Sequence, residues 1–455
     1  MPELKRRGVS FGDKALPLST QQIDNSKQLR AKPRKYSALP ACLFWTCVVT
    51  VVVYLTANRP TQAAYHPSLL VDGEYYAVED YPHPFIHVVH TRFMQEQANL
   101  TALGEARLAL LETFCLPTLK AQTSQNFLWI LKTDPDLPRD LLHRLKEDLQ
   151  GFPNFYLVAS NRNFRINQNF PGAWRDGAQG ADLSQSTIHT GNRTLLEMAM
   201  ALQAKLPIVE TRLDADDGLH RGFMEQLQKQ ASAVFNDMKD SKWMYWCARR
   251  HMEWHWMKQD PPNSTVADLT HAYGSLTGIQ NSHLCITPGF SVGFPVGTPE
   301  PDVPVFPHHT LVERIRHLPP EKSCGLAKPD DCLQFVETHV FEAIRSRTPT
   351  SAGMLNVQLD DSMIVKTPWL MYAYWDMLFD SFGIAREHVK WINDYVYKHL
   401  AAIAHDNLAG QCTSGHSCKD EAKADLSKIL DSHPKDESTN ATGPPKRLYV
   451  EVGQA

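Results

Sequence analysis

Three aspartates follow one apolar segment closely: Asp214, Asp216 and Asp217 lie in RLDADDGLH (212–220), directly behind LPIVET (206–211). Ionised carboxylates this close repel one another, so a cation must offset the repulsion if each is to keep a fixed place. Mg²⁺ and Mn²⁺ prefer oxygen ligands and need only one or two carboxylates beside phosphate oxygens. The pattern therefore indicates a divalent cation held against the diphosphate of a nucleotide-sugar, where it would offset charge on the departing nucleoside diphosphate.

Two other carboxylate motifs fit less well. In an EF-hand loop counted from Asp214, the glycine would be the sixth residue, but Gly218 is the fifth, and Arg221 occupies an apolar position. A phosphatase of the haloacid dehalogenase type usually has Thr or Val where Gly218 stands. The calcium loop is rejected, and a metal-dependent phosphohydrolase is kept as the alternative enzyme.

Strands and helices alternate around this cluster. Strands are predicted at residues 85–93, 126–133, 155–160 and 206–213, and helices at residues 104–114, 138–149 and 192–204, the first interrupted by Pro117. Such an order forms a parallel sheet covered on both faces, whose ligands bind beyond the carboxyl ends of the strands. Polar residues follow four of these ends: Thr91 and Arg92, Asp134 and Asp136, Asn161 and Arg162, and Asp214 to Asp217.

The N-terminal segment has the features of a membrane anchor. The uncharged run ALPACLFWTCVVTVVVYLTA (38–57) is about long enough to cross a bilayer, and a basic segment precedes it. The positive flank should stay in the cytoplasm, which places the rest of the chain in the lumen. We expect an uncleaved single-pass anchor in the Golgi or endoplasmic reticulum membrane, with a cleaved signal peptide as the alternative. Sequons at Asn99, Asn192, Asn263 and Asn440 agree with that location.

Charge and cysteine content narrow the class further. The net charge of -4 leaves no general basic surface, and no zinc-finger or aromatic-basic RNA motif is present, so nucleic acid is not an expected partner. Seven of nine cysteines follow the predicted span, so at least one stays unpaired. Cys324 with Cys332 and Cys412 with Cys418 could each close a local loop, and Cys115 is expected to be a buried free thiol.

Five blocks of the sequence resemble one family. FIHVVHTRF, FLWILKTDPDL, TRLDADDGL, CITPGFSVG and RTPTSAGM together look like the putative rhamnosyltransferase family, a group of GT-A-type glycosyltransferases, from about residue 84 to 385. The resemblance implies an α/β, GT-A-like fold: a Rossmann-like, mostly parallel central sheet with helices on both faces. It also implies a nucleotide-sugar donor and Mn²⁺ or Mg²⁺.

With this resemblance the chain divides into five parts. Residues 1–37 form a basic cytoplasmic tail, 38–57 the transmembrane anchor, 58–83 a stem, 84–405 the luminal glycosyltransferase domain, and 406–455 a polar tail that we expect to be disordered.

The resemblance also assigns roles by position. Asp214 would contact the ribose or the metal, and Asp216 and Asp217 the metal and the diphosphate; Arg212 would pair with a phosphate or with the aspartates. Donor contacts are expected from Thr91, Arg92, Asp134 and Asp136, with a simple turn as the alternative for the last two. His309, in PHH (307–309), is the candidate for an extra metal ligand from a later loop, with a surface loop as the alternative.

An inverting transferase needs a carboxylate that deprotonates the acceptor hydroxyl. Glu253 in HMEWHW (251–256) is our candidate, and in a strand it would share one face with His251 and His255. Asp360 and Asp361 compete with it, so the stereochemical outcome stays open. Arg347 could hold a phosphate.

The sequence thus predicts a single-span membrane glycosyltransferase that transfers a sugar from a nucleotide-sugar to a glycan or glycoprotein acceptor. The phosphohydrolase is one alternative. A membrane-anchored carbohydrate-binding protein without turnover is the other.

Overall fold

The computed structural model describes residues 76–160, 186–237, 242–256, 274–280, 285–296, 298, 308–326, 328–338, 341–350 and 371–413. All of them belong to one compact unit, residues 62–455. No helix within these ranges is long and apolar enough to span a bilayer. The predicted anchor at residues 38–57 lies outside the described residues.

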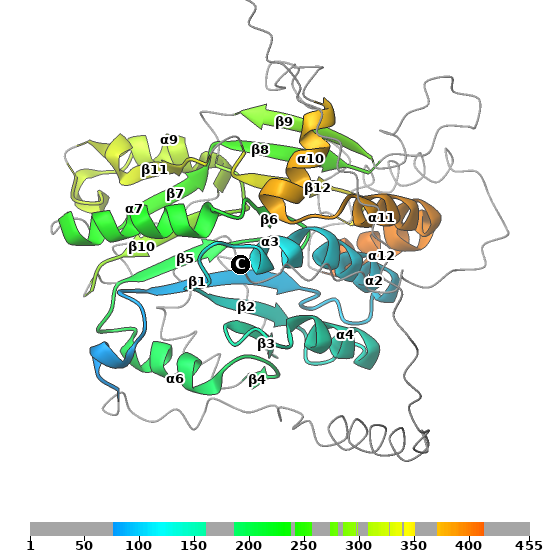
Figure 1. Ribbon diagram of the computed structural model, residues 1–455, viewed down its shortest axis with the longest axis horizontal. Coiled ribbons are helices and arrows are strands. Elements are labelled where there is room, and N and C mark those ends of the chain that lie inside the picture. Colours follow the sequence, from blue (N-terminus) through cyan, green and yellow to red (C-terminus); the bar gives the residue numbers. More distant parts are fainter. Residues whose placement is uncertain are drawn as a thin grey trace, which may run out of the picture. The chain divides into compact units, whose positions relative to one another are not determined.

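The central sheet, sheet A, carries the predicted strands. Its members are β1 (Ile86–Phe93), β2 (Leu128–Thr133), β3 (Phe155–Ala159), β4 (Thr187–Ile188), β5 (Ile208–Arg212), β7 (Met244–Ala248), β10 (Phe290–Phe294) and β11 (Leu333–Val336). Among the described residues their order is β11-β7-β10-β5-β1-β2-β3-β4 (Figure 1). The predicted parallel pairing holds for β5, β1, β2 and β3. The sheet as a whole is mixed, because β10 is antiparallel to both β5 and β7 and β4 is antiparallel to β3.

Helices cover both faces of sheet A, as predicted. They are α2 (Thr101–Leu110), α3 (Leu116–Lys120), α4 (Arg139–Leu149), α6 (Arg193–Leu202), α7 (Phe223–Asp237) and α9 (Leu311–Arg316). Side chains alternate along β1, so Val89 packs in one apolar core with α2, α4 and α7, while Val88 packs in another with α6 and α9. Short helical turns lie at Val78–Asp80, His308–Thr310, Pro320–Lys322 and Pro329–Cys332.

The first predicted helix does not end at Pro117. From α2 the chain passes through a π-helical turn, Leu111–Cys115, and continues as α3. Pro117, which has no N–H to donate, directly follows this π-helical turn, and the helix continues past it. The prediction of a break at Pro117 is therefore wrong.

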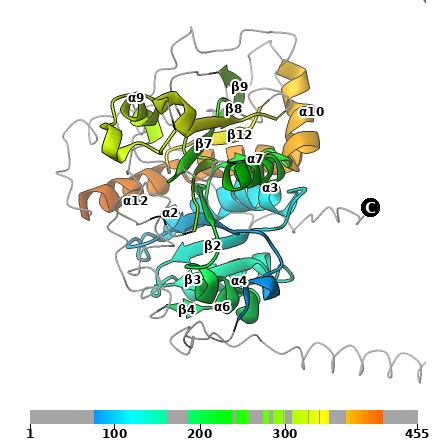
Figure 2. The ribbon, with the colours of Figure 1, turned by 90° about the vertical axis from the view of Figure 1, so that its left-hand side faces the viewer.

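A second sheet, sheet B, adjoins the first and was not predicted as a sheet. It consists of β6 (Gly218–Leu219), β12 (Ala343–Arg347), β8 (Arg250–His255) and β9 (Ser275–Gln280), in that order. Its apolar side packs on α10 (Met371–Phe382) and α11 (Arg386–Lys398). Figure 2 separates β8, β9 and β12 from β2, β3 and β4 of sheet A.

Helix α12 (Leu400–Thr413) crosses the predicted end of the domain at residue 405. The oxygen Oδ2 of Asp406 accepts hydrogen bonds from the backbone N–H groups of Ala102 and Leu103, at 2.9 and 3.3 Å, and so caps the first turn of α2. The polar composition after residue 405 predicted a disordered tail. Asp406 instead lies in helix α12 and caps α2, a helix that is distant in the sequence.

Two disulfide bonds lie in the described part of the chain. The predicted Cys324–Cys332 bond is confirmed, and Cys115 is free and buried, as predicted. Cys247–Cys285 joins β7 to the segment before β10 and was not predicted. The pairing of Cys412 with Cys418 lies outside the described residues.

Candidate functional site

The three aspartates form a turn that links the two sheets. β5 ends at Arg212 in sheet A, and β6 of sheet B begins at Gly218. The turn is closed by a hydrogen bond from the backbone N–H of Asp217 to the carbonyl of Asp214, at 3.1 Å. Gly218 has no room for a side chain, since a Cβ would lie 2.7 Å from Thr118 Cγ2 and 2.9 Å from the Phe114 carbonyl. Close packing therefore explains this glycine.

Asp214 pairs with Arg212. Its Oδ1 accepts hydrogen bonds from the Arg212 Nη2 and Nε, at 3.1 and 3.3 Å. Burial raises the pKa of Asp214, but the charge and hydrogen bonds of Arg212 outweigh it, and the net pKa is lowered. Of the two predicted partners for Arg212, phosphate or aspartate, the structure shows the aspartate.

Asp217 is the most deeply placed of the three, with 5% of its surface exposed. Its Oδ1 accepts a hydrogen bond from the backbone N–H of Ser346 in β12, at 3.0 Å. Burial and the neighbouring charge of Asp216 raise the pKa of Asp217 well above its usual range, against the opposing charge of Arg345. Negative charge at this end of the turn is thus only partly compensated by the protein.

Arginines from separate elements face the aspartate turn. Arg107 of α2 donates to the carbonyl of Thr350 at 3.2 Å, and burial lowers its pKa while the charges of Asp216 and Asp214 raise it. Burial, followed by the charge of Arg212, lowers the pKa of Arg92 in β1 to about 10. Together with Arg345, these side chains place positive charge around the turn.

Two of the remaining predicted donor contacts, Thr91 and Asp134, have hydrogen-bond partners within the protein. Thr91 is buried, and its Oγ1 accepts a hydrogen bond from the Trp129 indole at 2.8 Å. Asp134 accepts from the backbone N–H of Asp136 at 2.8 Å and from that of Glu96 at 3.0 Å. The turn alternative therefore describes Asp134. The Asp134 side chain thereby fixes the loop between β1 and α2, in which Glu96 has a φ of 60°.

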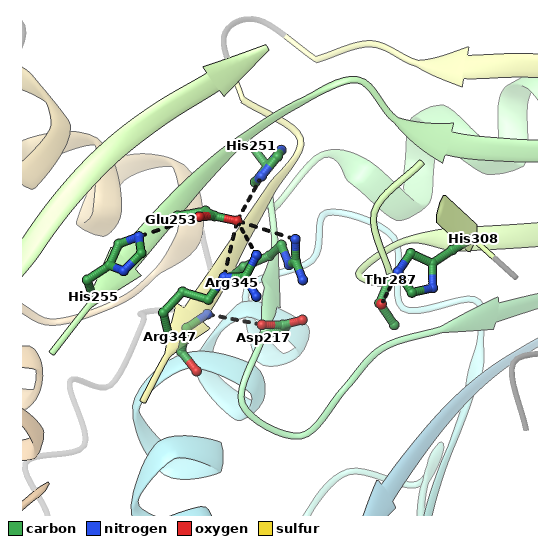
Figure 3. Close-up of polar contacts among 9 residues, drawn as sticks. Asp217, His251, Glu253, His255, Thr287, His308, Arg345 and Arg347 are labelled. Atoms are coloured by element: carbon green, nitrogen blue, oxygen red, sulfur yellow. Dashed lines mark hydrogen bonds and ion pairs between the residues drawn. The ribbon is translucent and has the colours of Figure 1, made fainter. Parts of the chain in front are cut away.

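Glu253 is the hub of a buried charged cluster (Figure 3). Its Oε1 accepts hydrogen bonds from Arg347 Nη2 at 2.8 Å and Arg345 Nη1 at 3.3 Å, and lies 3.4 Å from His251 Nε2. His255 Nε2 lies 3.4 Å from the other oxygen. Burial raises the pKa of Glu253, but the bonds from His251, His255 and Arg347 outweigh it and hold the pKa far below its usual range.

A general base works best when its pKa lies near the working pH. The low pKa of Glu253 and its pairing with two arginines depart from that condition, and its role as catalytic base stays a prediction. Its competitors Asp360 and Asp361 lie outside the described residues.

The charge of His308, the residue before the predicted ligand His309, lowers the pKa of Asp214, and His308 Nε2 lies 3.4 Å from Thr287 Oγ1 (Figure 3). The side chain of His309 is outside the described part of the structure. Within that part, no group of three or more histidine, cysteine or acidic side chains could hold a metal ion without help from a ligand.

Sequence reasoning missed Arg107, Arg345 and His308. Arg345 is two residues before Arg347, just ahead of the block RTPTSAGM, so strand periodicity could have placed both on one face. Nothing in the helical pattern around Arg107 distinguishes it from a solvent-exposed arginine.

Comparisons with known proteins support the class. The model of the family described as "Putative rhamnosyl transferase" matches residues 93–174, which confirms the resemblance over that part of the chain and supports a glycosyltransferase. A search of curated proteins finds no match.

Solved structures give a weaker likeness. The chain is similar to S. aureus TarS residues 1–349, at 10% identity and a TM-score of 0.21, covering 76% of this chain and 79% of that one. It is also similar to TarS 1–349 in complex with UDP, at 12% identity and the same TM-score, covering 76% of this chain and 90% of that one. So low a TM-score establishes no shared fold, so the fold rests on the topology described above.

These findings correct the expected location. The assignment to the Golgi or endoplasmic reticulum membrane is withdrawn. The described ranges contain no helix that could cross a bilayer, and the solved structures found are of S. aureus TarS.

Proposed function

We propose that this chain is a GT-A-like glycosyltransferase that transfers a sugar from a nucleotide-sugar to a glycan or glycoprotein acceptor. The observation that carries the proposal is the aspartate turn at the carboxyl end of β5, near the middle of sheet A, with arginines from α2, β1 and β12 around it. In α/β sheets this edge is where ligands bind.

The chemistry of the donor set fits a divalent cation. Asp216 and Asp217 supply the carboxylate oxygens that Mg²⁺ and Mn²⁺ prefer, and the diphosphate of the donor would supply the rest. Asp214 is already paired with Arg212, so we place the ion at the Asp216–Asp217 end of the turn. There the ion would act as a Lewis acid that offsets charge on the diphosphate.

Arginine side chains are the second part of the site. Guanidinium groups bind phosphate oxygens with two parallel hydrogen bonds, and here they are held in place before any ligand arrives. Charge that develops on the leaving nucleoside diphosphate would thus meet preorganised donors, which lowers the barrier to transfer.

The test measures nucleotide binding by the purified full-length chain. We expect one of UDP, GDP, ADP, CDP and dTDP to raise the melting temperature in the presence of Mn²⁺, because a ligand that binds only the folded state stabilises it. Asp217→Asn should abolish the Mn²⁺-dependent shift, whereas Asp140→Asn, an exposed carboxylate in α4, should leave it unchanged.

The alternatives predict other outcomes. Hydrolysis of phosphomonoesters without use of any nucleotide-sugar would support a phosphohydrolase. Glycan binding without donor turnover would support a carbohydrate-binding protein.

A further inference from the structure

The cluster around Glu253 lies next to the aspartate turn because of strand register. β12 pairs in parallel with β8, so Arg345 lies opposite Glu253 and Arg347 opposite His255. Between the two arginines, Ser346 donates its backbone N–H to Asp217. One strand therefore contacts the aspartates through its backbone and Glu253 through the side chains on either side.

Burial makes this arrangement rigid. The side chains of Glu253, Arg347 and Arg345 are 2%, 14% and 21% exposed. Three hydrogen bonds from the two guanidiniums converge on a single oxygen, Oε1, at 2.8 to 3.3 Å. A buried carboxylate bound in this way fixes the orientation of each guanidinium. A solvent-exposed ion pair would not do so.

The cluster also carries more positive than negative charge. One carboxylate faces two guanidiniums, and Arg345 acts electrostatically on both Asp214 and Asp217. Figure 3 shows Arg345 between Glu253 and Asp217. A guanidinium fixed by one acid and directed towards others has unused donors for an incoming anion, since arginine has five N–H groups.

We infer that Glu253 is a positioning residue that holds Arg345 and Arg347 so that Arg345 contacts the terminal phosphate of a nucleoside diphosphate at the aspartate turn. The inference rests on the proposed function for the identity of the nucleotide. In this proposal Glu253 orients the two arginines and is not the catalytic base. Arg345 recognises the terminal phosphate of the nucleotide.

The experiment compares ligands that differ by that phosphate. Binding of each nucleoside diphosphate of the screen, of its monophosphate and of inorganic pyrophosphate is measured by calorimetry on the full chain with Mn²⁺. We expect Glu253→Gln and Arg345→Gln each to weaken diphosphate and pyrophosphate binding roughly tenfold or more. Monophosphate binding should change less than about twofold, because the phosphate that Arg345 contacts is absent from it.

A matched control separates positioning from stability. Glu342 is fully buried just before β12, and its carboxylate accepts a hydrogen bond from Nη2 of Arg250 in β8, at 2.7 Å, not from Arg345 or Arg347. Glu342→Gln should lower the melting temperature as much as Glu253→Gln and leave diphosphate affinity unchanged. If Glu253→Gln does not fold, Arg345→Gln carries the test, because Glu253 then keeps Arg347 and His251.

Each outcome decides between the two claims. Diphosphate binding that is equal in wild type and both variants overturns the positioning role and leaves the proposed function standing. If wild type binds pyrophosphate but no nucleotide, and the variants lose pyrophosphate binding, the phosphate contact is supported and the nucleotide donor is refuted. If wild type binds neither, both fail.

Discussion

The neutral form of His87 is required by its hydrogen bonds. In the fully buried interior of β1, its Nδ1 accepts from the Gln228 amide at 3.0 Å, and its Nε2 lies 2.9 Å from Thr211 Oγ1. Thr211 bonds Ser291, whose hydroxyl donates to the carbonyl of Gly289 at 3.0 Å. This chain is complete when Nε2 carries the only ring proton, and a second proton on Nδ1 would face an N–H donor.

The cost of protonation follows from the pKa. Burial lowers the pKa of His87 from 6.5 to about 3. The unfolded chain then binds a proton that the folded chain excludes, so stability is complete above pH 6.5 and falls as the pH drops towards 3. Between pH 7 and pH 5 the loss from this histidine alone is about 2 kcal/mol.

The assay is urea unfolding of wild type and His87→Gln at pH 7 and pH 5. We expect wild type to lose about 2 kcal/mol more than the variant over this interval, because every other histidine is common to both. His143→Gln, on the exposed surface of α4, should behave as wild type does. Equal pH dependence in wild type and His87→Gln would refute the reasoning.

Three further predictions test interactions that stabilise the fold around the site. Replacing Cys247 and Cys285 with serine opens a loop with a sequence separation of 38 residues and should lower the free energy of unfolding by about 4 kcal/mol, measured by urea titration; a loss below about 1 kcal/mol would contradict the loop-entropy estimate. Asp406→Ala should remove the cap of α2 and cost about 1 kcal/mol in the same assay, and an unchanged midpoint would exclude the cap. Gly191→Ala should cost more than about 2 kcal/mol, because φ is +95° and the new Cβ would lie 2.2 Å from Tyr156 Cδ1; an equally stable variant would show that the ring can move aside.

The parallel centre of sheet A was predictable because its signals are local. Each strand there is an apolar run followed by polar residues, and its neighbours come from a repeated strand–helix order. The aspartate turn could be predicted for the same reason. Its position at the end of β5 needed only the residues on either side of it.

Sheet B and most of the charge compensation depend on pairings distant in sequence. β6 meets β12 across more than a hundred residues, and the contact of Ser346 with Asp217 exists only because of that pairing. Glu253 looked like a free carboxylate in the sequence because its arginine partners lie 92 and 94 residues later. A local pattern cannot show that such a group is already paired, so the sequence alone could not weigh this pairing against a role as catalytic base.

The repulsion among the three aspartates is relieved unevenly, and that asymmetry bears on where a cation would bind. Asp214 has two hydrogen bonds from a guanidinium, whereas Asp217 has a single backbone N–H on Oδ1 and lies deeper, beside Asp216. Buried carboxylates are stabilised by cations close to them, and Arg345 divides its charge between this turn and Glu253. The pKa of Asp214 is therefore lowered and that of Asp217 raised, and this difference is the reason for proposing the cation at the end of the turn where β6 begins.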